Sequence, residues 1–284
     1  MKAVSRRGSP TAGPDPGGNG DPVLRVAGLS VSYGQAGQRT TAVREVSFDI
    51  GPGEILGLVG ESGSGKSSVC GALMRLLPRS ASMRADEVTF GGTDLTGLSA
   101  RAMRDVRGSR LALIPQKPMT SLSPTTPIAR QLRWYLGEEF DKPESRQLII
   151  DLGLRAVLDR PRSLPSSFSG GQLQRLLILI AALVREPALV LADEPTTTLD
   201  ATVQAQVLSL LLDLRERIGN SMIFVSHDLG VISQVCDRIG VMYGGMLVEI
   251  ATAREALANP QHPYLHAMLG ALPSRHARGE RLRA

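Results

Sequence analysis

The chain has 284 residues, of which 42% are hydrophobic and 21% charged, and its formal net charge is +5. This composition predicts a sizeable folded core and excludes a disordered chain, a collagen and a small disulfide-rich scaffold. The longest apolar run, Leu176 to Val184, is shorter than the roughly 20 residues that a membrane-spanning helix needs.

The excess positive charge lies at the two ends of the chain, which leaves the body between them neutral. We interpret residues 1–22, rich in Gly and Pro, as a disordered leader and residues 274–284 as a basic tail that is solvated rather than bound to lipid or nucleic acid. No secretory signal is visible, and Cys70 and Cys236 show no metal-ligand spacing. We therefore expect a cytoplasmic protein with two buried thiols.

The first half of the ordered chain alternates strand and helix patterns. Residues 23–33 and 43–50 are predicted to be strands joined by a Gly- and Gln-rich turn. The short apolar run 55–59 is typical of a buried strand, and a Gly/Ser loop follows it. A helix is predicted over 67–77, with Pro78 ending it.

The second half begins with a Pro-broken region, residues 117–170, that is predicted to be a helical insertion with helical segments near 130–136 and 144–158. After it come a helix over 171–185, a buried strand over 188–191, a helix over 203–217 and a buried strand over 222–225. A hairpin over 239–250 turns at Gly244-Gly245. This order predicts an α/β fold with a mostly parallel sheet that is covered on both faces.

One segment matches the phosphate-loop pattern G-x-x-x-x-G-K-[ST] in full, with a strand before it and a helix after it. Its backbone N–H groups and the helix N-terminus can cradle phosphate oxygens, while the Lys reaches the β- and γ-phosphates and the following Ser ligates Mg²⁺. The alternative is a Gly/Ser turn with a chance Lys, but the chain has only four Lys. We therefore predict nucleotide binding by Gly60, Glu61, Ser62, Gly63, Ser64, Gly65, Lys66, Ser67 and Ser68.

A pair of carboxylates, Asp193 and Glu194, follows the predicted buried strand 188–191. The carboxyl end of a parallel strand borders the ligand crevice of an α/β sheet. We expect Asp193 to hold Mg²⁺ and Glu194 to orient and deprotonate an attacking water. The alternative, a solvated acidic pair before a Pro, leaves this placement unexplained.

Taken with five further elements, these motifs resemble those of an ABC-type ATPase, over about residues 23–273. Gln116 is similar to the family's Q-loop glutamine, His227 to its switch histidine and Tyr33 to its adenine-stacking aromatic residue. The segment Thr197-Thr198-Leu199-Asp200 resembles the D-loop, with Asp200 as its acidic residue. A further segment resembles the family's ABC signature, and it comprises Phe168, Ser169, Gly170, Gly171 and Gln172. Alone, each of these residues has an ordinary structural interpretation, as a loop, turn or packing residue.

The resemblance implies a P-loop ABC ATPase domain with a RecA-like, mostly parallel sheet core, an antiparallel β subdomain and a helical subdomain insertion. It implies ATP hydrolysis with Mg²⁺ held by Ser67, Gln116 and Asp193, and with catalysis by Glu194, His227 and Gln116. The signature would contact the γ-phosphate bound by a partner subunit, so that ATP joins two head-to-tail subunits.

Within the superfamily, the chain is similar to the peptide/nickel importer ATPases in its segments 116–124, 192–206 and 259–264. The resemblance implies a peripheral protein on the cytoplasmic face of the inner membrane. Its expected partners are two permease subunits, an extracytoplasmic substrate-binding protein and a second related ATPase, a heterodimer being favoured over a homodimer. Peptides, nickel and metal chelates remain open as cargo. Near the end of the chain, His262 and Tyr264 are interpreted as structural residues that pack a C-terminal helix.

The chain departs from the group at three places. Lys117 stands where an acidic residue is usual, which reverses the charge on the expected permease-facing loop. Phe168 opens the signature in place of the usual Leu, and Ser166-Ser167 replace a usual His-Glu. A Cys-rich extension that holds an iron–sulfur cluster in some relatives has no counterpart, so we predict no cluster.

Two other functions are weighed against an importer ATPase. A non-transport ABC ATPase acting on DNA needs a long coiled-coil insertion, but only 102 residues separate Ser67 from Ser169, and ribosome-acting members usually carry two cassettes. The neutral body also argues against a nucleic-acid partner. A small GTPase or a kinase would leave the signature-like segment and the helical insertion without a role.

Overall fold

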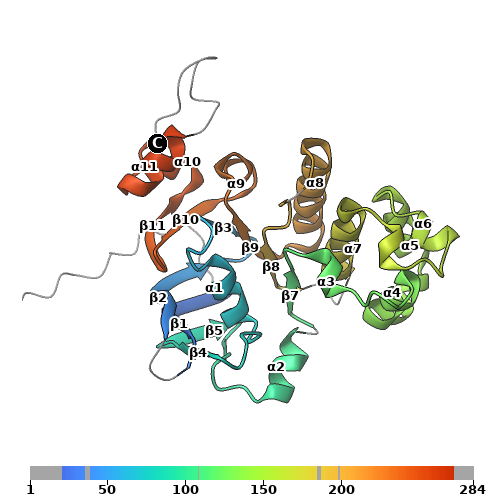
Figure 1. The fold of residues 1–284 in the computed structure, drawn as a ribbon, viewed down its shortest axis with the longest axis horizontal. Coiled ribbons are helices and arrows are strands. Elements are labelled where there is room, and N and C mark those ends of the chain that lie inside the picture. Colours follow the sequence, from blue (N-terminus) through green and yellow to red (C-terminus); the bar gives the residue numbers. More distant parts are fainter. Residues whose placement is uncertain (1–20, 36–38, 108, 184–186, 198, 272–284) are drawn as a thin grey trace, which may run out of the picture.

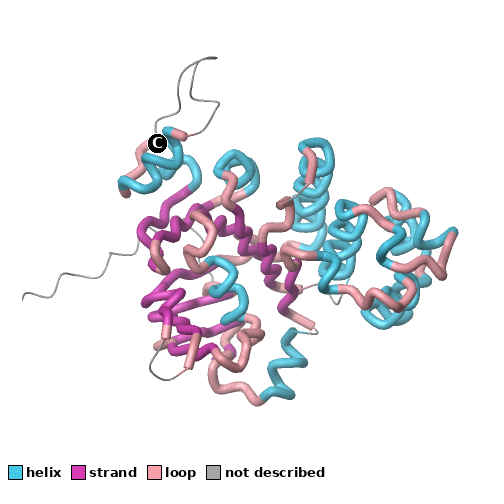
Figure 2. Tube along the Cα trace, viewed as in Figure 1, coloured by secondary structure: helices cyan, strands magenta, loops and turns pink. Residues whose placement is uncertain are grey.

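The computed structural model describes residues 21–35, 39–107, 109–183, 187–197 and 199–271. The predicted leader up to residue 20 and the predicted basic tail lie outside the described residues. Within the described part, two sheets and a set of helices are arranged around two hydrophobic cores (Figures 1 and 2).

The central sheet has the strand order β11-β10-β3-β9-β8-β7. Its neighbouring strands run parallel except for the edge strand β11, which forms an antiparallel hairpin with β10. This is the mostly parallel sheet that the alternation of apolar strands and helices predicts. Its strands are β3 (Ile55–Val59), β7 (Leu111–Ile114), β8 (Leu189–Asp193), β9 (Ser221–Ser226), β10 (Arg238–Tyr243) and β11 (Met246–Thr252).

The central strands are buried on both faces, which explains why they are continuous apolar runs. Along β9, Ile223 and Val225 belong to one hydrophobic core, whereas Met222 and Phe224 belong to the other. Successive side chains of a strand point to opposite faces, so one short strand supplies both cores. The first core also takes in residues of the second sheet and α1, and the other is covered by helices.

The second sheet is antiparallel and has the order β2-β1-β5-β6, with β4 also paired to β1. The sequence pattern predicts its long strands β1 and β2. The stretch 79–114, for which the pattern predicts no element, adds three short strands, the helix α2 (Ala100–Arg107) and the central-sheet strand β7. The strands of this sheet are β1 (Leu24–Tyr33), β2 (Thr40–Ile50), β4 (Ala81–Arg84), β5 (Glu87–Phe90) and β6 (Thr93–Asp94).

The remaining helices fall into two groups. One group lies against the sheets: α1 (Lys66–Leu73), α7 (Gly170–Leu183), α8 (Ala201–Ile218), α9 (Leu229–Val235), α10 (Ala253–Ala258) and α11 (Pro263–Gly270). The other projects away from the sheets beyond α7 (Figure 1). It comprises α4 (Ile128–Leu136), η1 (Gly137–Asp141), α5 (Pro143–Asp151) and α6 (Ala156–Asp159). In the chain, α3 (Pro118–Ser121) leads from β7 into this group, and η2 (Pro165–Ser167) leads from it to α7.

Two predicted helices differ substantially from the structure. The helix predicted to run to Leu77 ends at Leu73, because Arg75 adopts a left-handed φ of 49°. The N–H of Leu76 then donates to Gly71 O and that of Arg75 to Ala72 O, which is the hydrogen-bond pattern of a Schellman motif. The segment predicted to be helical over 144–158 is two helices, α5 and α6, separated at Gly153, whose φ is +68°.

Removal of the aromatic ring at the centre of β9 tests the packing of the parallel sheet. Phe224 is 1% exposed and lies in the larger core. We expect Phe224→Ala to lower the free energy of unfolding by about 3–5 kcal/mol, because it leaves a cavity between closely packed elements. Denaturant unfolding measures this change, with Trp134→Ala as the control, since Trp134 is 65% exposed. A loss for Phe224→Ala no larger than that of the control would contradict the packing described here.

Candidate functional site

Four neighbouring strands of the central sheet end at the same edge, and each delivers one predicted site segment there. The strands β3, β9, β8 and β7 are consecutive and parallel. The phosphate-loop segment directly follows β3, His227 directly follows β9, and Glu194 directly follows β8. Gln116 follows β7 after Pro115. The carboxyl edge of a parallel sheet is where ligands of α/β proteins bind, so the sheet order itself assembles the site.

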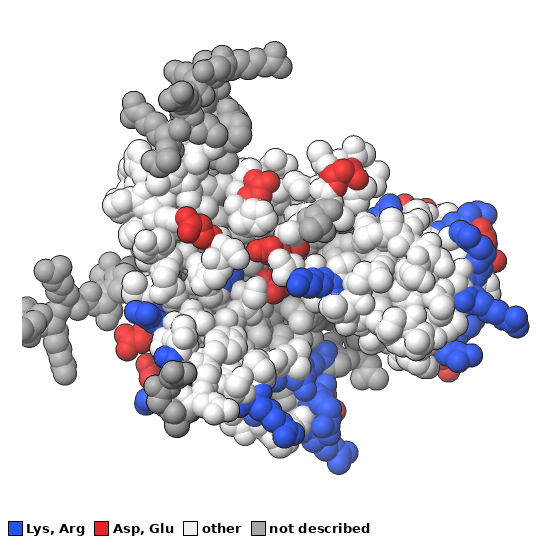
Figure 3. Space-filling model, in the orientation of Figure 1, with Lys and Arg blue, Asp and Glu red and all other residues white. Residues whose placement is uncertain are grey.

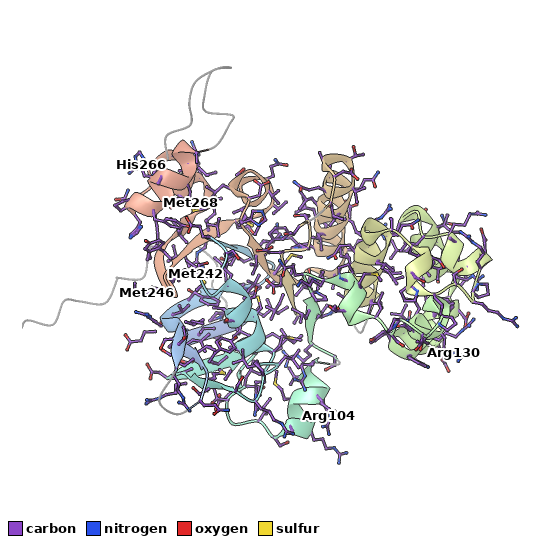
Figure 4. The ribbon with its side chains drawn as sticks, viewed as in Figure 1. Arg104, Arg130, Met242, Met246, His266 and Met268 are labelled. Carbon is purple, nitrogen blue, oxygen red and sulfur yellow. The ribbon has the colours of Figure 1, made fainter. Side chains whose placement is uncertain are left out.

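The phosphate-loop segment passes so close to other backbone that glycine is required at two positions. A Cβ atom at Gly60 would lie 2.2 Å from Met242 O, at the end of β10 (Figure 4). A Cβ atom at Gly65 would lie 2.4 Å from Ala42 O, and the φ of Gly65 is +103°. The loop therefore rests on β10 and β2, and its shape depends on having no side chain at these positions.

Lys66, the first residue of α1, is 4% exposed and folds back over the loop. Its Nζ donates to Gly60 O at 2.6 Å and to Glu61 O at 2.8 Å. Burial lowers the pKa of Lys66, although the carboxylates of Glu194, Asp193 and Glu61 act in the opposite direction. Within the described residues Lys66 forms no ion pair, so its charge is available to an anionic ligand at this loop.

Ser67 and Asp193, the pair predicted to hold a metal, are in direct contact. Ser67 Oγ donates to Asp193 Oδ1 at 2.9 Å. Burial raises the pKa of Asp193, and the nearby charge of Glu194 adds to this, whereas the Ser67 hydrogen bond and Lys66 lower it. No cluster of three or more His, Cys, Asp or Glu that could hold a metal occurs within the described part of the chain. Two hard oxygen donors fit Mg²⁺, which proteins commonly hold through one or two carboxylates together with substrate phosphates.

Glu194 is the most constrained residue of the site. Its φ is 47°, a left-handed value that is unusual for a residue with a side chain and that recurs at functional sites. Its Oε2 accepts hydrogen bonds from Gln116 Nε2 at 2.7 Å and from Thr197 Oγ1 at 2.9 Å. His227 Nδ1 lies 3.7 Å from Glu194 Oε1. The structure thus brings three predicted catalytic residues together and leaves Oε1 free of these two donors.

Thr197 is a contact of Glu194 that sequence reasoning missed. It belongs to the segment that resembles the D-loop, and its spacing of three residues from Glu194 is the only sequence signal for this contact. Asp200 of the same segment caps α8 by accepting a hydrogen bond from Val203 N, which is a structural role. Thr198 lies outside the described residues.

The signature-like segment forms its own helix end, apart from the phosphate loop. Ser169 Oγ accepts from Gln172 N at 3.3 Å, and Gln172 Oε1 accepts from Ser169 N at 3.0 Å, which is a capping box at the start of α7. Gly171 packs tightly, because a Cβ there would lie 2.8 Å from Val203 Cγ1. Among the described residues, no hydrogen bond joins Phe168, Ser169, Gly170, Gly171 or Gln172 to the phosphate loop.

Tyr33 lies at the end of β1, and its hydroxyl donates to Ser68 Oγ at 3.0 Å. This contact attaches the second sheet to the first turn of α1, next to the phosphate loop. Tyr33 also packs against the core that the two sheets share.

With this geometry established, the comparison with known families is decisive. The model of the ABC transporter family matches residues 43–197, which is more than half of the chain. The chain belongs to the ABC transporter family. As a member of this family it binds and hydrolyses ATP, and the family, fold and ATPase activity predicted from the residues are confirmed.

Several curated members of the ABC transporter family are similar to this chain over most of its length. The oligopeptide transport ATP-binding protein OppD of Bacillus subtilis is 41% identical over 91% of this chain and 74% of the relative. The peptidoglycan transport ATP-binding protein YejF of Agrobacterium fabrum is 44% identical over 90% of this chain. The chain spans 48% of the length of that relative.

Solved structures share the ABC fold at lower sequence identity. A dimeric ATP-binding cassette in a post-hydrolysis state, bound to ADP and Pi, matches with a TM-score of 0.68 at 24% identity, over 81% of this chain and 99% of that one. The cbiO1 protein of Clostridium perfringens, part of an ABC transporter complex, matches with a TM-score of 0.66 at 20% identity, over 90% of this chain and 97% of that one. A separate finding is that no helix of the described residues has the length and apolar character needed to cross a membrane.

Proposed function

We propose that this chain is the ATP-hydrolysing subunit of an ABC importer that takes up peptides. The observation that carries the proposal is the pair of contacts Ser67–Asp193 and Gln116–Glu194, which joins the phosphate loop, the metal carboxylate and the catalytic carboxylate at one sheet edge. The peptide assignment rests on the names of relatives that are about 40% identical.

ATP binds at the phosphate loop through backbone N–H groups and the N-terminus of α1, which both favour anionic oxygens. Lys66 exchanges its contacts with Gly60 O and Glu61 O for phosphate oxygens. Ser67, Asp193 and Gln116 would hold Mg²⁺, which would neutralise phosphate charge when bound. Tyr33 offers its ring to adenine, and Glu61, Ser62, Gly63, Ser64 and Ser68 complete the loop.

Glu194 accepts the proton of the attacking water. Its two hydrogen bonds, from Gln116 and Thr197, fix one carboxylate oxygen and leave Oε1 toward His227. A carboxylate that is already oriented avoids reorganisation when the reaction occurs. His227, which is mostly exposed, stabilises the γ-phosphate side of the site.

The signature segment acts on the nucleotide of a partner subunit. Within the described residues, no hydrogen bond joins Ser169–Gln172 to the phosphate loop, and the capping box at the start of α7 does not use the N–H groups of Gly170 and Gly171. Both observations support action in trans, on an anion from elsewhere. The expected assembly has two permease subunits, a second related ATPase in a heterodimer, and an extracytoplasmic binding protein. The chain then lies on the cytoplasmic face of the membrane.

The charge distribution supports a protein partner over nucleic acid. Figure 3 shows basic side chains over α2 and over the outer end of the helical region, with acidic side chains between them in the middle of that face. Arg104 and Arg130 project from these two separate places (Figure 4). No continuous basic stripe, which is one form that a nucleic-acid surface takes, is visible on this face.

Removal of the Thr197 hydroxyl tests how the catalytic carboxylate is oriented. We expect Thr197→Val to lower kcat about tenfold while leaving the Kd for ATP unchanged, because a hydrogen bond to a charged group is lost away from the phosphates. Thr197→Ser keeps the hydroxyl and is expected to restore the rate. Steady-state hydrolysis by the assembled transporter measures both, and an unchanged kcat in the Val variant would remove Thr197 from this role.

Uptake by the native cell tests the proposed function. Replacing the chromosomal copy with Glu194→Gln is expected to abolish uptake of labelled oligopeptides. Glu216→Gln is the matched control, because it makes the same change at an exposed position on α8. Undiminished peptide uptake in the Glu194→Gln strain, with the protein present at wild-type level, would contradict the peptide-import proposal.

A further inference from the structure

The C-terminal part of the described chain makes a direct contact with the phosphate loop. Tyr264, in the first turn of α11, accepts a hydrogen bond through its hydroxyl from Glu61 N at 2.8 Å. The two residues are 203 positions apart. The sequence predicts only a packing role for Tyr264, and the proposed steps of ATP binding and hydrolysis do not involve it.

Tyr264 is held in place by a chain of hydrogen bonds that begins in the central sheet. The Glu249 carboxylate on β11 accepts from Gln261 N at 3.0 Å and from His262 N at 2.7 Å. His262 Nδ1 in turn accepts from Tyr264 N at 3.1 Å and so caps α11. The segment 259–264 is therefore attached to the same sheet as the loop, and it aims one hydroxyl at the loop.

The Tyr264 ring is fixed as well as its backbone. It lies against the ring of Tyr243, the last residue of β10, with the two centroids 4.6 Å apart. It also packs against the larger hydrophobic core. Fixing the ring on two sides removes the rotational freedom that would otherwise weaken the contact of its hydroxyl.

The contact with Glu61 matters because Glu61 is the second residue of the phosphate loop. Its carbonyl oxygen accepts from Lys66 Nζ at 2.8 Å and from Ser64 N at 3.2 Å. Its N–H donates a hydrogen bond to the Tyr264 hydroxyl. Both polar backbone groups of Glu61 are thus satisfied, one by the loop and one by α11, which fixes the direction in which the loop leaves β3.

We propose that Tyr264 is a positioning residue that holds the phosphate loop in its binding shape and thereby sets the affinity for ATP. The inference rests on the proposed binding of ATP at this loop. Without the hydroxyl, the first part of the loop has one constraint fewer, and nucleotide binding must supply the order that Tyr264 otherwise provides. The segment 259–264 is accordingly a functional part of the nucleotide site as well as a support for α11.

The test compares Tyr264→Phe with Tyr243→Phe. The two rings are neighbours, and each variant removes the hydroxyl of one of them. Within the described residues, the Tyr243 hydroxyl has no hydrogen bond, whereas the Tyr264 hydroxyl accepts one from Glu61 N. Equilibrium binding of MgATP to the purified full-length chain is measured, together with hydrogen exchange of the peptide that contains residues 59–66. We expect Tyr264→Phe to raise the Kd about 3- to 10-fold, as the loss of one hydrogen bond implies, and to speed exchange in that peptide.

The control variant is expected to match the wild type in both measurements. In the assembled transporter, Tyr264→Phe is expected to raise KM for ATP with kcat unchanged. If the wild type binds ATP and Tyr264→Phe has the wild-type Kd and wild-type exchange, the positioning role is wrong whatever the melting temperature does. If the wild type itself does not bind ATP, the proposed function fails instead, so the two failures are distinguishable.

Discussion

Glu194→Gln is expected to lower ATP turnover by about a hundredfold or more while leaving ATP binding intact. The carboxylate is the base that accepts a proton from water, and general base catalysis contributes a factor of this size. The amide of Gln keeps the shape of the side chain, so the contacts with Gln116 and Thr197 lose charge without opening a cavity. Because neither contact touches the phosphate loop, the Kd for ATP should stay within about twofold of the wild type.

Phosphate release by the assembled transporter and equilibrium binding by the purified chain measure these two quantities separately. Glu216→Gln is again the control for the chemical change, since Glu216 is exposed on α8. A Glu194→Gln transporter that hydrolyses ATP at the wild-type rate would exclude Glu194 as the catalytic base. Loss of binding together with loss of turnover would instead show that Glu194 supports the loop.

Lys66→Ala is expected to weaken ATP binding itself by roughly ten- to a hundredfold. The Lys66 ammonium is almost fully buried and its hydrogen bonds in the described structure go to the carbonyls of Gly60 and Glu61 and to Ser64 Oγ. A charge that has already lost its water interacts strongly with an incoming phosphate, and hydrogen bonds to charged groups are worth about 1.5–3 kcal/mol. The first expected effect of Lys66→Ala is therefore a lower affinity for ATP, ahead of any effect on the hydrolysis rate.

Lys142→Ala removes the same charge far from the site and is the matched control. Lys142 is exposed and pairs with Glu139, a type of contact that contributes little. Titration with a fluorescent ATP analogue in the presence of Mg²⁺ measures both variants. Equal affinities for Lys66→Ala and the wild type would contradict the assignment of the phosphate loop.

The parts of the fold and site that are local in sequence could be predicted from it. The loop from Gly60 to Ser67 follows from one pattern between a strand and a helix, and Asp193-Glu194 follows from its place after an apolar run. The buried strands were recognisable because a strand inside a parallel sheet must be apolar on both faces. The same rule, with the alternation of helices, predicted a mostly parallel sheet that contains β3, β8 and β9. It predicted neither β7 nor the order of the strands.

Contacts between distant residues could not be predicted in the same way. The hydrogen bonds from Gln116 to Glu194 and from Glu61 to Tyr264 span 78 and 203 positions, and no local pattern encodes them. The helix α1 ends early, at Leu73, because Arg75 adopts a left-handed backbone conformation that is rare for a non-glycine residue. In the sequence, Pro78 was therefore the stronger signal for the end of this helix. The short strands between Ala81 and Asp94 were missed because two to four residues carry too little periodicity.

Capture of the ATP-bound protein is the sharpest test of the transporter assignment. Tagged Glu194→Gln is produced in the native cell and purified from solubilised membranes with ATP and Mg²⁺, and the proteins that accompany it are identified by mass spectrometry. We expect two multi-spanning permeases together with a second, related ATPase, and recovery that depends on ATP and is lost when Lys66→Ala is added. Recovery of ribosomal or DNA-bound proteins without membrane proteins would contradict the transporter assignment.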